Sequence, residues 1–137
     1  MSFDKADCDN CPLRQYWVRK RKWKRVDFFD NDSSILILGD APSQQALNLG
    51  RAWADRHGVV VKEALGKAHP NQFDWGYTIG CRWPDDNPRA FLQMLAKRNR
   101  YLRSKGEPTL KSPLDACRGH LEERLKRYKT VITCGPA

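Results

Sequence analysis

With 137 residues, the chain is long enough for one domain in which helices cover a single sheet, and we treat residues 1–137 as one domain. No apolar run approaches the length of a membrane span, and the N-terminal sequence lacks the order of a signal peptide, so we expect a soluble protein of the cytoplasm or nucleoid without a membrane partner. Lysine and arginine number 25 against 16 acidic residues, and the net charge of +9 favours a polyanionic partner, with nucleic acid first.

The chain begins with two cysteines, Cys8 and Cys11, that are separated by two residues and followed by Pro12. Two thiolates at this spacing can bind one metal centre from a single tight turn. Five cysteines in an intracellular protein do not suggest a disulfide framework, so metal ligation and burial are the two roles left open. Further cysteines downstream are needed to complete a metal site.

A run of cations and tryptophans follows, from Arg14 to Arg25, and no acidic residue interrupts it. Phosphate contacts by the cations and stacking of bases on Trp17 and Trp23 predict a nucleic-acid surface. The alternative is a solvated helix face with the two tryptophans packed on the core. The cations that we assign to the DNA backbone are Arg19, Lys20, Arg21, Lys22, Lys24 and Arg25, together with Arg51 further along the chain.

Four aliphatic residues, Ile35 to Leu38, predict a strand that is buried on both faces. Gly39 then allows a sharp turn, and a short helix is expected over Gln44–Leu49. Ligands of open α/β sheets bind beside the carboxyl ends of the strands, which makes Asp40 a candidate for chemistry. A turn aspartate that caps the next helix is the alternative.

The remaining predicted elements alternate between helices and strands. Residues Val59–Leu65 are compatible with a strand or a helix, and we expect a helix because the segment ends like one. We then expect, in order, a strand over Trp75–Cys81, an amphipathic helix with a basic side over Arg89–Arg103, a helix from Ser112 to Lys129 and a third buried strand over Thr130–Gly135. On the last helix we expect one buried face formed by Leu114, Cys117, Leu121 and Leu125. This order predicts an α/β fold with a parallel sheet under helices.

Six motifs occur in the order seen in family 4 uracil-DNA glycosylases, which the chain resembles over nearly its whole length. They are Cys8-x-x-Cys11-Pro-Leu, Ile35 to Pro42, Gly50-Arg51-Ala52-Trp53, Tyr77 to Pro84, Ala116-Cys117-Arg118 and Val131 to Ala137. The resemblance implies a three-layer αβα fold around a short parallel sheet. It also implies a [4Fe–4S] cluster ligated by Cys8, Cys11, Cys81 and Cys117, with zinc on the same four thiolates as the alternative. Cys134 has no counterpart among these ligands and is expected to be a buried thiol.

The same resemblance implies a base pocket formed by Gly39, Asp40, Ala41, Pro42, Ser43, Trp53 and Tyr77. Asp40 would position the attacking water, in place of the family's Glu, and Trp53 would stack on the base unless it is an ordinary core residue. Tyr77 replaces the uracil-reading Asn, so the bidentate amide that separates uracil from cytosine is lost. The family's His-Pro-Ser motif has no counterpart, and we expect surface or packing roles for His57, His69 and His120.

Three functions are therefore open. The first, favoured by the altered pocket, is a DNA-binding [4Fe–4S] module that serves as a domain or subunit in DNA repair or replication. The second is an active uracil-DNA glycosylase completed by a further C-terminal segment or a partner, since the resemblance implies a C-terminally truncated and degenerate domain. The third is a zinc-stapled nucleic-acid binder. An uncovered sheet edge also predicts a protein partner or a further segment against Val131 to Cys134.

Overall fold

The computed structural model describes residues 3–134 of the chain, so the motif residues Gly135 to Ala137 lie outside the described part. Within it, three parallel strands form one sheet in the order β2-β1-β3: β1 (Ile35–Gly39), β2 (Asp74–Tyr77) and β3 (Thr130–Thr133). The α-helices are α1 (Pro12–Arg19), α2 (Gln44–Leu49), α3 (Arg56–Ala64), α4 (Pro88–Ser104) and α5 (Pro113–Leu125), and the short 3₁₀ turns are η1 (Cys8–Asn10), η2 (Pro70–Gln72) and η3 (Pro84–Asp86). The predicted α/β class with a parallel sheet is confirmed.

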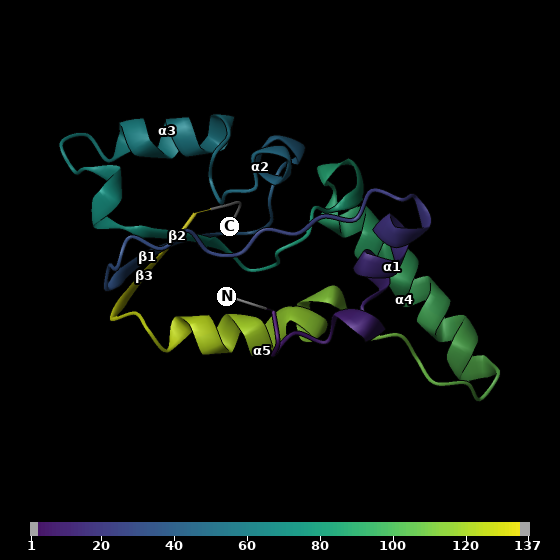
Figure 1. Ribbon diagram of the computed structural model, residues 1–137. Coiled ribbons are helices and arrows are strands. Elements are labelled where there is room, and N and C mark those ends of the chain that lie inside the picture. The colour runs from purple at the N-terminus through teal and green to yellow at the C-terminus, as the bar shows by residue number, and fades with distance from the viewer. Residues whose placement is uncertain (1–2, 135–137) are drawn as a thin grey trace.

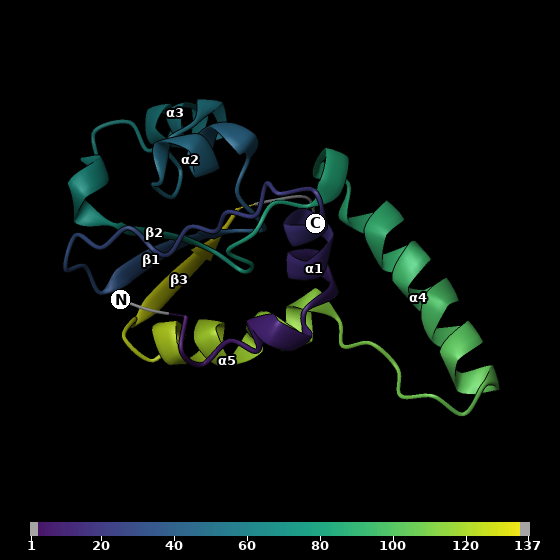
Figure 2. The ribbon, with the colours of Figure 1, turned by 45° about the vertical axis from the view of Figure 1, so that its right-hand side comes forward.

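Helices lie on both sides of this sheet. α2 and α3 lie on one side and α5 on the other, while α1 and α4 stand beyond one end of it, and α4 points away from the rest (Figures 1 and 2). None of the helices formed by residues 3–134 is long and apolar enough to cross a membrane.

The strands differ from the predicted ones in extent and burial. β1 is buried as expected, but β2 ends at Tyr77, where its partner β1 ends at Gly39, and the chain from Thr78 to Cys81 is irregular. β3 is exposed throughout, so the prediction of a third buried strand is wrong. Among the described residues β3 pairs only with β1, and the described part of the chain leaves its side chains uncovered, whereas the other edge strand, β2, is buried throughout. The docking of a partner on this edge stays a prediction.

The buried face of α5 also differs from the predicted one. Leu114 is exposed, and Leu121 and Leu125 are only half-buried. The fully buried side chains of this helix are Pro113, Ala116, Cys117, His120 and Arg124. Two of these are polar, and a polar group is buried without a large cost only when it has partners. The face of α5 is therefore set by what lies opposite it.

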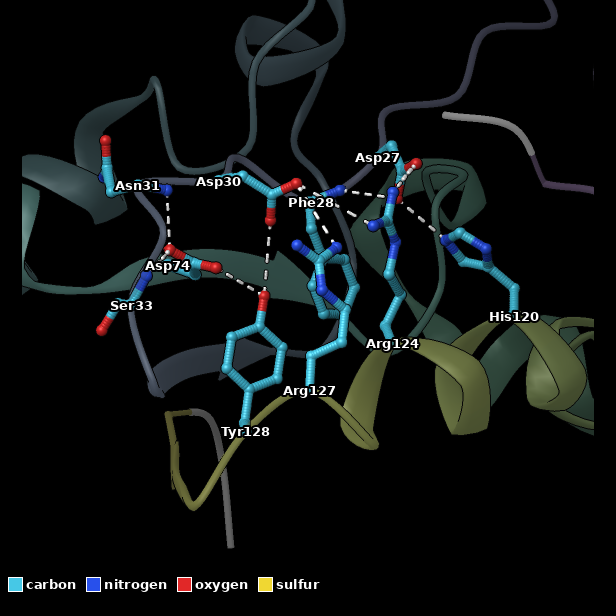
Figure 3. A network of polar contacts seen from close by, with 10 residues as sticks. All are labelled: Asp27, Phe28, Asp30, Asn31, Ser33, Asp74, His120, Arg124, Arg127 and Tyr128. Atoms are coloured by element: carbon cyan, nitrogen blue, oxygen red, sulfur yellow. Dashed lines mark hydrogen bonds and ion pairs between the residues drawn. The ribbon is translucent and has the colours of Figure 1, made fainter.

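What lies opposite α5 is a network of carboxylates on the segment before β1 and on β2 (Figure 3). The guanidinium of Arg124, which is only 2% exposed, donates to Asp27, and the His120 ring lies 2.9 Å from the same carboxylate. One turn further on, the Tyr128 hydroxyl donates to buried Asp74 at 2.7 Å. Asp74 also accepts two backbone N–H groups of the segment before β1, from Asn31 and Ser33. The network fixes α5, and with it Cys117, against the sheet.

Candidate functional site

The four cysteines that the resemblance assigns to a metal come from four different segments. Cys8 lies in η1, Cys11 caps α1, Cys81 follows β2 and Cys117 lies in the first turns of α5. Cys11, Cys81 and Cys117 are buried in one apolar cluster, and Cys8 lies close enough to raise the pKa of Cys81 and Cys117. We call these four residues the cysteine centre. The fold brings together the four thiols that the sequence predicts.

Backbone contacts hold the chain start against α5. The Asp7 N–H donates to the Ala116 carbonyl at 2.8 Å, directly before Cys8 and Cys117 respectively. Gly119 permits this approach, because a Cβ there would lie 2.2 Å from the backbone oxygen of Lys5. On the other side, the Val26 N–H donates to the Gly80 carbonyl at 2.9 Å, next to Cys81. Main-chain pairing therefore positions three of the thiols.

Burial favours the protonated form of the Cys11, Cys81 and Cys117 thiols when no metal is bound. Burial raises the pKa of Cys81 to about 12, and burial also raises the pKa of Cys11 and Cys117. Each neighbouring thiolate adds to the shift. A bound cation reverses this balance, because a metal ion deprotonates the thiols that ligate it. The Arg25 guanidinium donates to Cys8 Sγ at 3.0 Å, and its positive charge acts against the rise in the pKa of Cys117.

One indole N–H group beside the centre bears on the kind of metal that fits. The indole N–H groups of Trp23 and Trp83 are both buried and find no acceptor in hydrogen-bonding geometry among the described residues, but that of Trp83 acts on Asp40, whereas Trp23 packs against the thiol cluster. Trp23 also lies close enough to Cys81 to lower its pKa against the effect of burial. A buried donor needs a partner, and the sulfurs of a cluster are acceptors.

The residue types at the centre fit all-thiolate ligation of an iron–sulfur cluster, with the Trp23 indole as a nearby donor. Within residues 3–134, however, no three His, Cys, Asp or Glu side chains stand in an arrangement that could hold a metal ion as they are. The Cys11, Cys81 and Cys117 thiols lie in one apolar cluster with Cys8 nearby, but the four are not arranged around one ion position. Cys134 stands apart from them, half-buried against the other apolar cluster rather than buried as predicted.

The predicted base pocket lies at the carboxyl ends of the strands, where the side chains of Trp53 and Tyr77 occupy much of the interior. Their rings stack at 5.7 Å with an interplanar angle of 14°, and both side chains are buried. The Tyr77 hydroxyl accepts from the Trp53 backbone N–H at 2.7 Å, and the Trp53 indole donates to the Gly76 carbonyl at 2.9 Å. Gly39 makes room for this, because a Cβ there would lie 2.7 Å from the indole. Trp53 thus holds a core position, with one ring face covered by Tyr77.

A cavity of about 350 Å³ remains beside these rings, and Asp40 stands on its wall. Asp40 is largely exposed, and the partial burial of its carboxyl raises its pKa, with the Trp83 indole acting in the opposite direction. Asp40 does not cap the next helix. Ser43 does so, with its hydroxyl oxygen accepting from the Ala46 N–H at 3.2 Å. The carboxylate of Asp40 can therefore meet a ligand in this cavity, with the Trp83 indole as its neighbour.

Other predicted pocket residues have structural roles. Pro42 is fully buried, and Ala41 is half-buried on the cavity wall. The Ser43 hydroxyl donates to the buried carboxylate of Asp55 at 2.5 Å. Asp55 caps α3, because its carboxylate accepts from the Gly58 N–H at 3.0 Å. We did not predict this role, although an Asp at a helix start is a capping signal.

The predicted DNA contacts lie on the surface. α1 ends at Arg19, and residues 20–25 continue without regular structure. The six cations from Arg19 to Arg25 are all exposed, and so is Arg51, whose guanidinium lies 5.2 Å from the Phe29 ring. The tryptophans are not free stacking surfaces. Trp17 is half-buried and donates to the Arg82 carbonyl, and Trp23 is half-buried with two arginines over its ring, Arg14 and Arg25.

A scan against protein-family models matches none of them, and a search of curated proteins finds no significant match. The resemblance to uracil-DNA glycosylases therefore rests on the motifs in the sequence.

Proposed function

We propose that the chain is a DNA-binding module of the uracil-DNA glycosylase kind, with a [4Fe–4S] cluster at its cysteine centre and a base pocket too altered for catalysis. It would act as a domain or subunit of a DNA repair or replication assembly. The observation that carries DNA binding is the acid-free cationic segment 19–25. Within the described residues none of its six cations forms an ion pair with a carboxylate. The charge of Arg19, Lys20, Arg21, Lys22 and Lys24 is therefore available to phosphates, whereas Arg25 donates to Cys8 Sγ.

The cysteine centre supports the cofactor part of the proposal. Cys8, Cys11, Cys81 and Cys117 would hold the cluster, and the indole N–H group of Trp23 would donate to its sulfurs. Bound there, a [4Fe–4S] cluster supplies a structural cross-link and a redox-active group. The residues themselves join the chain start, the loop after β2 and α5.

The stacked rings of Trp53 and Tyr77, at the carboxyl ends of the strands, support loss of catalysis. A base that stacks on Trp53 needs an open ring face, and Tyr77 covers one. The Tyr77 hydroxyl accepts from the Trp53 backbone, and a single hydroxyl cannot replace a bidentate amide in reading a base.

DNA binding is tested by the salt dependence of affinity for a labelled oligonucleotide. Reversing Arg19, Lys22 and Lys24 to Glu should reduce the slope of log K against log salt by about 2 to 3, because each lost phosphate contact removes about 0.7–0.9. The matched control reverses Lys5, Lys67 and Lys129, exposed cations outside the segment, and changes net charge equally. Equal losses in both triple variants would refute the assignment of segment 19–25.

The cofactor is tested by metal analysis and visible absorbance of the protein purified without oxygen. We expect about four irons per chain and a brown colour. Cys117→Ser should lose both, whereas Cys134→Ser, a matched thiol outside the centre, should keep them. A colourless protein with about one zinc per chain would instead support the zinc-stapled alternative.

A second function, an active glycosylase, is favoured by one observation. Asp40 presents a carboxylate on the cavity beside Trp53, where an attacking water could be oriented. Release of free uracil from uracil-containing DNA by the wild-type protein, abolished in Asp40→Asn, would establish this function and refute the loss of catalysis.

A further inference from the structure

The surface between α1 and α4 is hollowed into a groove of about 430 Å³, away from both sites described above. Its floor comes from both helices, and its far wall comes from the loop after α4. The apolar and aromatic side chains that line it are Tyr16, Phe91, Met94, Leu95, Leu102 and Leu110. Arg19 and Arg98 also line the groove, one from each helix. An apolar floor thus lies between two positive charges.

The far wall is held by hydrogen bonds rather than left free. The Asn99 side chain donates to the Leu110 carbonyl at 3.0 Å and accepts from the Leu110 N–H at 2.7 Å. The Glu107 N–H donates to the Leu102 carbonyl at 2.9 Å. A ligand therefore meets a formed groove and does not have to order this loop on binding.

Both helices of the groove carry cations and contain no acidic residue. α4 contains no Asp or Glu, and its cations are Arg89, Lys97, Arg98, Arg100 and Arg103. In the described part of the chain none of these five forms an ion pair, and the same holds for segment 19–25 across the groove. Each segment contributes one unpaired cation to the groove lining, Arg19 and Arg98, and such a pair is complementary to a polyanion.

The floor adds a second requirement. Phe91, Leu95 and Leu102 are buried, but Met94 is 55% exposed and Tyr16 is half-buried, so apolar side chains are open to a ligand. Nucleobases stack on aromatic side chains and pack against apolar ones, provided that they are unpaired. A duplex keeps its bases inside, so its phosphates could meet the cations while its bases could not reach this floor.

We propose that this groove binds single-stranded nucleic acid, with a base on the floor at Tyr16 and Met94 and the neighbouring phosphates at Arg19 and Arg98. The inference rests on the proposed DNA-binding function and adds to it a preference for single strands and the place where a base is held. An oligonucleotide and an acidic peptide share negative charge, but only the oligonucleotide brings a flat base for each charge.

The test compares Met94→Glu with Gln93→Glu. Both variants add one negative charge to α4, but Gln93 is exposed outside the groove and Met94 lines it. The probes are a labelled oligothymidylate of about 12 nucleotides and a blunt duplex, and anisotropy gives the affinities. For the duplex we expect equal, small losses. For the single strand, Met94→Glu should bind about tenfold more weakly than Gln93→Glu, since a lost base contact typically costs that much.

The outcomes separate this inference from the function on which it rests. Equal affinities of the two variants for the single strand would overturn the groove and leave DNA binding standing. Failure of the wild-type protein to bind either probe would overturn the proposed function itself. Oligoglutamate binding that Met94→Glu weakens and Gln93→Glu does not, without such a difference for oligothymidylate, would assign the groove to an acidic peptide. Equal melting temperatures of the two variants would show that both fold.

Discussion

Replacing Asp27 by Asn tests whether the network in Figure 3 stabilises the fold. Burial alone would raise the pKa of Asp27, but hydrogen bonds from His120 and Arg124 lower it from 3.8 to about 2. A carboxylate whose pKa is depressed on folding stabilises the protein above its unfolded-state pKa, and this stability is lost as pH falls towards the folded-state pKa. The shift corresponds to about 2 kcal/mol at pH 7 and about half of that at pH 3.

Asp27→Asn should therefore lower the free energy of unfolding by about 2 kcal/mol at pH 7, and the melting temperature of a domain of this length by about 7 °C. The difference from wild type should shrink to about 1 kcal/mol at pH 3. Calorimetry or circular dichroism at both pH values measures it. The control is Asp32→Asn on the same segment, which removes an exposed carboxylate with no ion pair among the described residues and keeps a residue that tolerates the positive φ of 58°.

A loss that does not change between pH 7 and pH 3 would refute the electrostatic reasoning, because only the ionised carboxylate is stabilised by its partners. An equal loss in Asp32→Asn would refute it as well, because it would reduce the effect to net charge.

Three further changes test single contacts. Gly58→Ala would place a Cβ 1.8 Å from the Trp53 carbonyl oxygen, so we expect a loss of at least about 1–3 kcal/mol in thermal unfolding, and an unchanged melting temperature would contradict this packing. Tyr77→Phe leaves the Trp53 N–H buried without its acceptor and should cost about 1–3 kcal/mol in urea denaturation, with no cost if water replaces the hydroxyl. Asn99→Ala removes both hydrogen bonds to the loop over 105–111 and should speed tryptic cleavage there, whereas unchanged cleavage would mean that the loop is held otherwise.

The sequence predicted best what depends on local pattern. The aliphatic run of β1 and the stripe of α4 gave the correct elements, because burial on two faces or on one helical face is written into the order of residues. The turn after Gly39 was also predicted, together with the helix that follows it. Each of these features is decided within about a dozen residues.

What the sequence could not predict depends on partners that lie far away in the chain. Arg124 and His120 occupy the buried face of α5 because the Asp27 carboxylate lies opposite them. The sequence around α5 does not show that this distant residue is its partner. β3 has the residues of a core strand, yet its exposure is decided by how much of the rest of the chain covers its side chains. Trp53 is likewise buried because Gly39 leaves space above the strand, which a candidate stacking residue does not reveal by its own sequence.

The backbone hydrogen bond from Asp7 to Ala116 has a consequence for biosynthesis. During translation Cys8 and Cys11 leave the ribosome long before α5, which carries Cys117. The N-terminal segment therefore cannot form its contacts with α5 until most of the polypeptide has been synthesised. Contacts between such distant parts of a chain form late and slowly. A metal or iron–sulfur cluster on these thiols would therefore be inserted only after α5 has been synthesised. A ribosome-stalled fragment that lacks α5 should be colourless and prone to degradation.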